Sequence, residues 1–263
     1  MKTGMHYGDM GDIIYCIPTC RALGITKLYI SIENECHTKM TAYNIRFMAP
    51  LFAHMGIEMV LWNHKDDYDY DLNAYRKLME DLTYTHLGLS QARAMGVDVD
   101  MSARYIDVEE KRKGLKPYII VNRTLRYNNA SFNWQMLLNS HENIYFVGTE
   151  EEYSYLRTIT GADISYLYVD DMLELARYIK GAYAFIGNQS SPFAVAEGLK
   201  VNRIQETCEW VPNALPMSKN GFPVITKMQN RKAMMMLERW RVNEPRRSET
   251  TYFVEIASSK EED

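Results

Sequence analysis

The sequence is poor in cysteine and has no long apolar segment. Its four cysteines, Cys16, Cys20, Cys36 and Cys208, include no C-x-x-C pair. No second ligand pair at zinc spacing accompanies Cys36 and His37, so we expect no metal site. No apolar run approaches the ~20 residues that span a bilayer, and the N-terminus lacks the pattern of a signal peptide. The sequence therefore predicts a cytoplasmic protein without a transmembrane segment.

A strong excess of one charge is also missing. The formal net charge is −4 over 263 residues, which gives no overall preference for nucleic acid or an anionic membrane. Residues 226–247 are an exception, because seven Lys and Arg stand there against two Glu, a local charge of +5. This pattern is typical of a solvated helix face with a basic tail. A surface that faces phosphates is the alternative.

Short apolar segments alternate with helical patterns along the chain. The expected strands are 2–7, 27–33, 58–63, 104–108, 118–122, 144–148, 164–169, 184–188 and 223–226. The expected helices are 12–23, 42–56, 72–82, 86–96, 133–140, 149–161, 171–182, 191–199 and 231–243. Residues 109–117 are charged and end in proline, which makes them the best linker candidate. The alternation predicts an α/β protein with two parallel sheets that face a cleft.

The first candidate site is the turn that follows the first expected strand. It reads Gly8-Asp9-Met10-Gly11-Asp12, which is neither the G-x-G-x-x-G fingerprint of dinucleotide-binding proteins nor a P-loop. Its glycines let a ligand approach the backbone, and the helix that follows offers free N–H groups to an anion. The alternative is that Asp12 only caps this helix.

Two further loops follow strands of the second half. The turn Asn188-Gln189-Ser190-Ser191 opens a helix with small hydroxyl side chains and exposed amides, which suit a diphosphate. Glu197 lies about two turns deeper, within reach of a ribose. Ser191 as an ordinary cap and Glu197 as a solvated side chain are the alternatives. The other loop places Arg123 and Arg126 after residues 118–122, where an arginine can clamp a phosphate or simply be solvated.

Together these segments resemble the heptosyltransferase-like glycosyltransferases (glycosyltransferase family 9). The stretch GDMGDIIYCIPTCRAL is similar to the G-D-x-x-x-x-x-P-x-x-x-x-L start of that family, and YDYDLNAYRK resembles a segment of its N-terminal domain. FVGTEEEYSYLRTITG, with Gly148, resembles a strand-Gly-helix segment of the second domain. Residues 171–199 resemble its region with the motif N-D-S-G-P-x-H-x-A-x-A-L. The similarity runs in order over about residues 4–210.

The resemblance implies a GT-B fold and an inverting, metal-independent glycosyltransferase that needs no cofactor. Residues 1–113 would form a Rossmann-like domain for the acceptor, and residues 114–226 a second such domain for a nucleotide-sugar donor. Residues 227–263 would form a helix that crosses back to the first domain, followed by a polar tail. The acceptor would be a glycan or a lipid-linked sugar, while the basic segment leaves room for a nucleic acid with a hydroxylated base.

The resemblance also implies a role for each candidate residue. Asp12 matches the catalytic base of the family, and Arg126, or alternatively Arg123, matches the residue that stabilises the departing diphosphate. The other residues with implied roles are Gly8, Asp9 and Gly11 for the turn or the acceptor, and Gly148, Asn188, Gln189, Ser190, Ser191 and Glu197 for the donor.

Three positions depart from the motif of the family. Gln189, Ser191 and Ala194 stand where the family has Asp, Gly and His, so the donor can differ from ADP-heptose. Two other functions stay open. One is a nucleotide-sugar epimerase or hydrolase that acts on the donor alone. The other is a non-catalytic nucleotide-binding protein, which Gln189 and Ala194 would fit.

Overall fold

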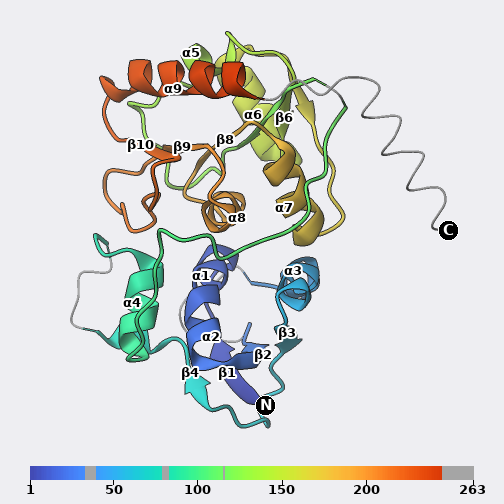
Figure 1. Cartoon of the computed structure of the whole chain (residues 1–263), viewed down its shortest axis with the longest axis vertical. Helices are drawn as coiled ribbons and strands as arrows, with labels where there is room; N and C mark the ends of the chain where they lie inside the picture. The colour runs from blue at the N-terminus through green and yellow to red at the C-terminus, as the bar shows by residue number, and fades with distance from the viewer. Residues whose placement is uncertain (33–39, 79–82, 115, 245–263) are drawn as a thin grey trace, which may run out of the picture.

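The computed structural model describes residues 1–32, 40–78, 83–114 and 116–244, and it contains two parallel β-sheets (Figure 1). The first sheet has the strand order β3-β2-β1-β4. Its strands are β1 (Lys2–His6), β2 (Ile25–Ile30), β3 (Glu58–Leu61) and β4 (Tyr70–Asp71). The helices of this half are α1 (Met10–Tyr15), α2 (Ile17–Leu23), α3 (Ala42–His54), the 3₁₀ helix η1 (Ala74–Lys77) and α4 (Leu87–Ala94).

The second sheet has six strands in the order β10-β9-β8-β5-β6-β7. They are β5 (Ile119–Asn122), β6 (Ile144–Phe146), β7 (Ile164–Tyr166), β8 (Ala184–Asn188), β9 (Arg203–Glu206) and β10 (Gly221–Val224). The helices are α5 (Trp134–Leu138), α6 (Glu150–Thr160), α7 (Met172–Gly181), α8 (Ser191–Leu199) and α9 (Gln229–Asn243). The chain order reverses between β5 and β8, and open parallel sheets bind ligands outside the carboxyl ends of the strands at such a point.

Several helix ends follow directly from the sequence. Thr149 and Glu152 form a capping box at the start of α6, and Gly161 ends this helix with a φ of 65°. Asp171 caps α7 by accepting a hydrogen bond from the backbone N–H of Glu174. The expected helix 12–23 is divided at Cys16, because Pro18 lies in the first turn of α2 and supplies no N–H to continue α1.

The two halves are joined by apolar packing as well as by the chain. Helix α1 packs against α8, and α3 packs against α7 (Figure 1). A single core cluster contains Ile13 and Met48 from the first half and Phe193 and Leu175 from the second. Within the described residues, no helix is long and apolar enough to cross a membrane.

Three expectations about elements are corrected by the structure. Residues 104–108 form no strand, and the backbone N–H groups of Tyr105 and Ile106 donate to the carbonyl of Gly198 instead. The helical pattern at 72–82 forms only the short helix η1, and residues 79–82 lie outside the described part. Strand β9 was not predicted, because its residues Arg203, Gln205 and Glu206 are polar yet buried.

Helix α9 packs on the second sheet and does not cross back to the first domain over Gln229–Asn243. It contacts α5, β8 and β10, and Ala233 and Leu237 are buried in the core of the second half (Figure 1). The prediction that this helix crosses back to the first domain is therefore wrong for Gln229–Asn243, because its buried apolar side chains pack on the second sheet. The remaining expected tail, residues 245–263, lies outside the described residues.

Candidate functional site

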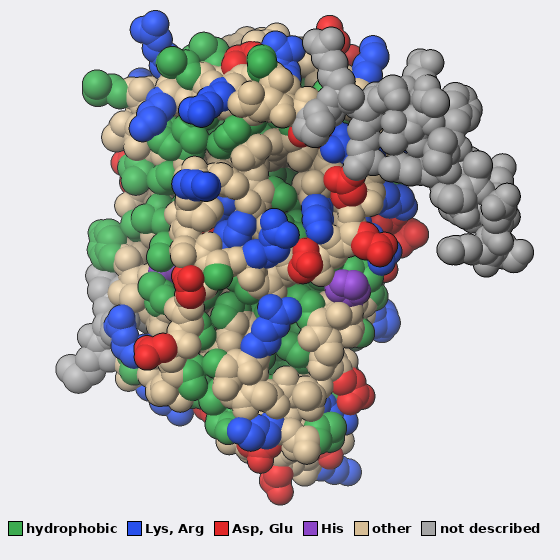
Figure 2. All heavy atoms as spheres, viewed as in Figure 1, with side chains coloured by type: hydrophobic (Ala, Val, Ile, Leu, Met, Phe, Trp, Pro, Cys, Tyr) green, Lys and Arg blue, Asp and Glu red, His purple; other side chains and the backbone are tan. Residues whose placement is uncertain are grey.

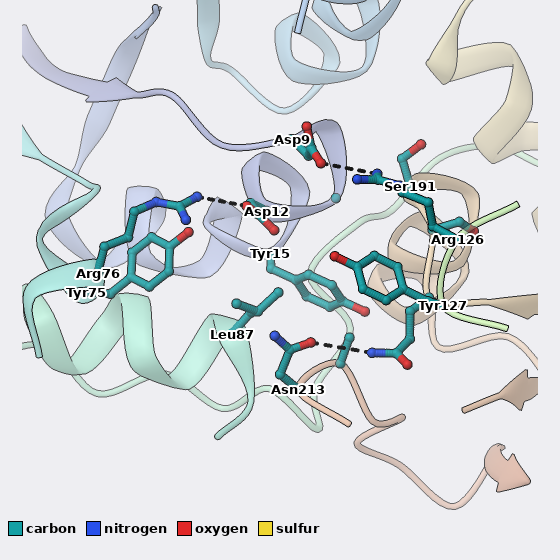
Figure 3. A pocket seen from close by; sticks show the side chains of 14 residues that line it. Asp9, Asp12, Tyr15, Tyr75, Arg76, Leu87, Arg126, Tyr127, Ser191 and Asn213 are labelled. Carbon is teal, nitrogen blue, oxygen red and sulfur yellow. Dashed lines mark hydrogen bonds and ion pairs between the residues drawn. The ribbon is translucent and has the colours of Figure 1, made fainter. Parts of the chain in front are cut away.

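A cavity of about 380 Å³ opens between the two halves, at the carboxyl ends of β1 and β8 (Figure 3). Seven of the predicted site residues line it: Asp9, Gly11, Asp12, Arg126, Gln189, Ser190 and Ser191. All of these except Asp12 also line an adjoining cavity of about 380 Å³. The two cavities therefore form two lobes of one cleft, and residues from both halves separate them.

The carboxylate of Asp12 projects into the first lobe from the first turn of α1. The guanidinium of Arg76, on η1, lies 3.0 Å from Oδ2 of Asp12 (Figure 3). Burial raises the pKa of the Asp12 carboxyl, and the positive charge of Arg76 opposes this rise. The N-cap of α1 is Asp9, so the alternative in which Asp12 caps this helix is wrong. A carboxylate with a raised pKa beside a cavity is suited to accept a proton.

The turn after β1 brings Asp12 close to a buried histidine. The backbone N–H of Gly8 donates to Nδ1 of His6 at 2.8 Å. A Cβ atom at Gly8 would lie 2.6 Å from Cβ of Asp12 and 2.6 Å from Cε1 of His6, which leaves room only for glycine. Burial is the main cause that lowers the pKa of His6 to about 3. Gly8 thus shapes the turn, and it does not line the cavity.

An ion pair spans the cleft between its two lobes. Nη2 of Arg126, from the loop after β5, lies 3.2 Å from Oδ2 of Asp9, which follows β1 (Figure 3). The side chain of Arg126 is 47% exposed and that of Asp9 is 33% exposed. Exposed pairs of this kind contribute at most about 1 kcal/mol, so an incoming anion can replace Asp9 on Arg126.

The start of α8 forms the opposite wall of the cleft. Ser190 caps this helix, and its hydroxyl accepts a hydrogen bond from the N–H of Phe193, so the expected cap at Ser191 is wrong. Ser191 borders both lobes, and its backbone nitrogen lies 4.0 Å from the position of a Cβ atom built on Gly11. The side-chain amide of Gln189 donates to the carbonyl of Val211 and accepts from Cys208, which fixes the loop after β9.

Four predicted donor residues lie outside the two lobes. Glu197 is fully buried, and its carboxylate pairs with Arg203 at 2.5 Å and with Lys200, so it is neither solvated nor available to a ribose. Arg123 is buried against Glu206 at 2.9 Å and faces away from the cleft. These two assignments are corrected because each side chain is used by a buried partner.

The other two residues shape the loops beside the cleft. Asn188 is buried, and its side chain bonds to the backbone of Thr124 and Arg126. Asn188 therefore holds the loop that carries Arg126. Gly148 has a φ of 146°, and a Cβ atom there would lie 2.7 Å from Oε2 of Glu152 in the capping box. Neither residue borders the two lobes, so neither is placed to touch a donor in them.

Sequence reasoning missed several residues of the first lobe: Tyr15, Tyr75, Arg76, Leu87, Tyr127, Asn213 and Ala214. A signal was present for two of them. Arg76 lies in the segment YDYDLNAYRK, which carries part of the family resemblance. Tyr15 follows Asp12 by three residues and so lies on the same face of α1 (Figure 3). The loop with Asn213 gave no such signal.

No protein-family model and no curated protein matches the sequence, but solved structures match it over most of its length. The iron-containing heptosyltransferase TibC, solved with ADP-D-β-D-heptose, has a TM-score of 0.59 at 13% identity, over 90% of this chain and 77% of that chain. Escherichia coli heptosyltransferase WaaC with ADP has a TM-score of 0.58 at 12% identity, over 91% and 100%. A family 9 glycosyltransferase from Veillonella parvula has a TM-score of 0.56 at 11% identity, over 90% and 97%.

The chain has the GT-B fold. The predicted fold class, α/β with two Rossmann-like parallel sheets, is confirmed, and the resemblance to the heptosyltransferase-like glycosyltransferases is confirmed as a likeness of fold.

The expectation of a metal-free protein is contradicted by one of these comparisons. TibC is described as iron-containing, so the GT-B fold of this kind does not imply the absence of a metal. In the described part of this chain, no group of three or more His, Cys, Asp or Glu side chains could hold a metal ion. The metal-ligating side chains in the described part of the chain therefore do not fit an iron site. Cys36 and His37 lie outside the described residues.

Proposed function

We propose that this protein is an inverting glycosyltransferase, which moves a sugar from a nucleotide-diphosphate donor to an acceptor hydroxyl. The observation that carries the proposal is the pairing of opposite chemistries across one cleft. A carboxylate with a raised pKa, Asp12, borders the cavity on one side. Arg126 and the helix start at Ser190 and Ser191 border it on the other. Similar folds in complexes with ADP-heptose and ADP support the donor class.

In this mechanism Asp12 takes the proton of the acceptor hydroxyl as its oxygen attacks the anomeric carbon. The bond from that carbon to the diphosphate oxygen breaks at the same time, and attack from the opposite face inverts the anomeric configuration. Arg126 stabilises the negative charge of the departing diphosphate together with Ser190, Ser191 and the amides of the helix start. Arg126 must release Asp9 to do so.

The arrangement also assigns one substrate to each half. We place the acceptor against residues 1–113, which carry Asp12, and the donor against residues 114–226, which carry Arg126. The acceptor class that the fold suggests is a glycan or a lipid-linked sugar. The first lobe fits a sugar ring, because the exposed ring of Tyr127 supplies a flat apolar surface with a polar edge, beside the buried rings of Tyr15 and Tyr75 (Figure 3).

The first experiment is a thermal-shift screen with UDP-, GDP-, ADP-, CMP- and dTDP-sugars. A ligand at ~100 times its Kd stabilises the folded state by about 2.7 kcal/mol, which raises Tm measurably. A shift with one nucleotide class supports the donor site and identifies the donor. The absence of any shift would contradict the proposal. Hydrolysis of the donor without an acceptor would instead favour the hydrolase alternative.

The second experiment is the Asp12→Asn variant, with transfer measured on the donor that the screen selects. Removal of a general base lowers kcat by at least ~10²-fold, while Kd for the donor stays within about twofold, because Asp12 lies on the acceptor half. The matched control is Asp163→Asn, which changes an exposed carboxylate that lines neither lobe of the cleft. Transfer by Asp12→Asn at the rate of the native protein would exclude this mechanism.

A further inference from the structure

The outer face of helix α9 carries an apolar stripe that no part of the described chain covers. Met228, Met235 and Val242 are 90%, 64% and 76% exposed, and they follow one another at intervals of seven residues. Seven residues are nearly two full turns, so the three side chains lie on one side of the helix over ~21 Å. The opposite side of α9 is packed, because Ala233 and Leu237 are buried.

Basic side chains flank this stripe on both sides. By the helical spacing of 100° per residue, Lys232 and Arg239 lie on one flank, and Arg231 lies on the other, which also carries Glu238 in an ion pair with Arg241. Lys232, Arg239 and Arg231 are exposed, and none of them forms an ion pair with a described residue. Figure 2 shows Lys and Arg side chains along the top of the molecule, over α9, together with hydrophobic side chains and some Asp and Glu side chains.

A basic cavity adjoins the first turn of the same helix. It has a volume of about 610 Å³ and is lined by Arg123, Lys227 and Arg231 together with the apolar side chains of Trp134 and Ile159. No Asp or Glu among the described residues lines it. Arg123 holds Glu206 through two of its nitrogens and lies over the ring of Tyr155, so the cations that the cavity leaves open to a ligand are Lys227 and Arg231. The cavity thus offers cationic groups to a phosphate.

We propose that the outer face of α9 docks on a membrane that contains anionic lipids. A lipid surface satisfies both features at once, because it presents negative head groups to the basic flanks and acyl chains to the apolar stripe. The cavity beside the first turn takes one lipid phosphate. A nucleic acid would satisfy the charges only, since a phosphate backbone offers no apolar surface to Met235 and Val242.

The test is co-sedimentation of the full chain with vesicles, and it is independent of the proposed glycosyltransferase activity. We expect binding to vesicles of phosphatidylcholine with 30% phosphatidylglycerol and at least tenfold weaker binding to pure phosphatidylcholine. The Lys232→Glu/Arg239→Glu variant should bind at least ~30-fold more weakly, because each cation near such a surface contributes about fivefold. High salt should weaken the binding of the native chain as well.

The apolar stripe has its own variant and control. Met235→Glu/Val242→Glu should abolish vesicle binding, while Tyr168→Glu, an equally exposed position that lies off α9, should leave it unchanged. Circular dichroism and Tm check that each variant is folded. Equal binding to both kinds of vesicle would overturn the proposal, as would binding that the stripe variant retains.

Two other results would also overturn it, and each would identify a different occupant. A dimer in light scattering that Met235→Glu/Val242→Glu dissociates would show that a second copy covers the stripe. Binding to a DNA duplex that the basic variant loses and the stripe variant keeps, without vesicle binding, would show a nucleic-acid surface.

Discussion

At the scale of a single residue, Arg76 opposes the rise that burial causes in the pKa of Asp12. Its guanidinium lies 3.0 Å from the carboxylate and also 4.8 Å from the ring centre of Tyr75, which holds it in place. Burial raises the pKa of Asp12, and the positive charge of Arg76 opposes this rise. Arg76 is therefore a positioning residue for the proposed base, and its removal should change when the base is ionised.

We predict that Arg76→Gln moves the acidic limb of the pH–rate profile to higher pH. The variant loses the positive charge that favours the ionised carboxylate, so the pKa of Asp12 rises. The active, deprotonated form of Asp12 is then populated only at higher pH. The measurement is transfer rate against pH for both proteins. Arg104→Gln, which changes an exposed arginine paired with Asp107, is the control. An unchanged acidic limb would show that Arg76 does not act on Asp12.

Asp9 is the first acid of the opening turn, and its carboxylate pairs with Arg126. We predict that Asp9→Asn tightens binding of the nucleoside diphosphate that the screen selects by severalfold, because Arg126 no longer has to be released. Arg126→Gln should weaken it by about tenfold or more, since a charge-assisted contact to phosphate is lost. Titration calorimetry measures both values. Weaker binding by Asp9→Asn would instead place Asp9 among the groups that hold the donor.

At the scale of elements, the carboxylate of Glu206 on β9 helps to hold the loop that carries Arg126. Glu206 is fully buried and accepts hydrogen bonds from Arg123, from the indole of Trp134 and from the backbone of Asn129. Residues 123–133 thus form an ordered loop between β5 and α5. Glu206 and Asn188 thus hold from two sides the loop whose Arg126 and Tyr127 line the cleft.

We predict that Glu206→Gln lowers the free energy of unfolding by about 3–5 kcal/mol, because it leaves the buried guanidinium of Arg123 without a counter-charge. The matched control is Glu174→Gln, which removes a carboxylate paired with the half-exposed Lys111 and should cost at most about 1 kcal/mol. Urea unfolding measures both. An equal decrease in the free energy of unfolding in both variants would show that the buried Arg123–Glu206 pair contributes no more to stability than the exposed pair.

The elements that the sequence predicts well are those with local signals. Strand 184–188 and helix α6, with Thr149 and Gly161 at its ends, depend on apolar runs and caps that neighbouring residues provide. Strand β9 was missed by the prediction from sequence. Its polar residues are buried only because they pair with partners such as Arg123 and Glu197, and such pairing leaves no local pattern. The site behaves in the same way: Asp12 has a local motif, whereas Asn213 has none.

At the scale of the whole molecule, the buried side chain of His86 lies beside a contact between the two halves. Burial lowers the pKa of His6 to about 3, and burial likewise lowers the pKa of His86 to about 4. His86 caps α4 by accepting from the N–H of Gly88, and the neighbouring Leu87 donates to Asn213 of the second half. Protonation of His86 would remove this acceptor at a contact between the halves.

We predict that the free energy of unfolding falls as the pH is lowered from about 6.5 toward 5. In this range the unfolded chain, whose histidines have a pKa near 6.5, binds protons that the folded chain does not, so acid favours unfolding. Each such histidine contributes up to about 1.4 kcal/mol per pH unit, and the loss ends below its folded pKa.

In His86→Asn the side chain can still cap α4 but cannot titrate, so the slope should fall by about one proton while stability at pH 7.5 stays within about 1 kcal/mol. Urea unfolding at pH 7.5, 6.5, 5.8 and 5.0 measures the slope, and an equal slope in both proteins would show that His86 is already protonated in the folded state.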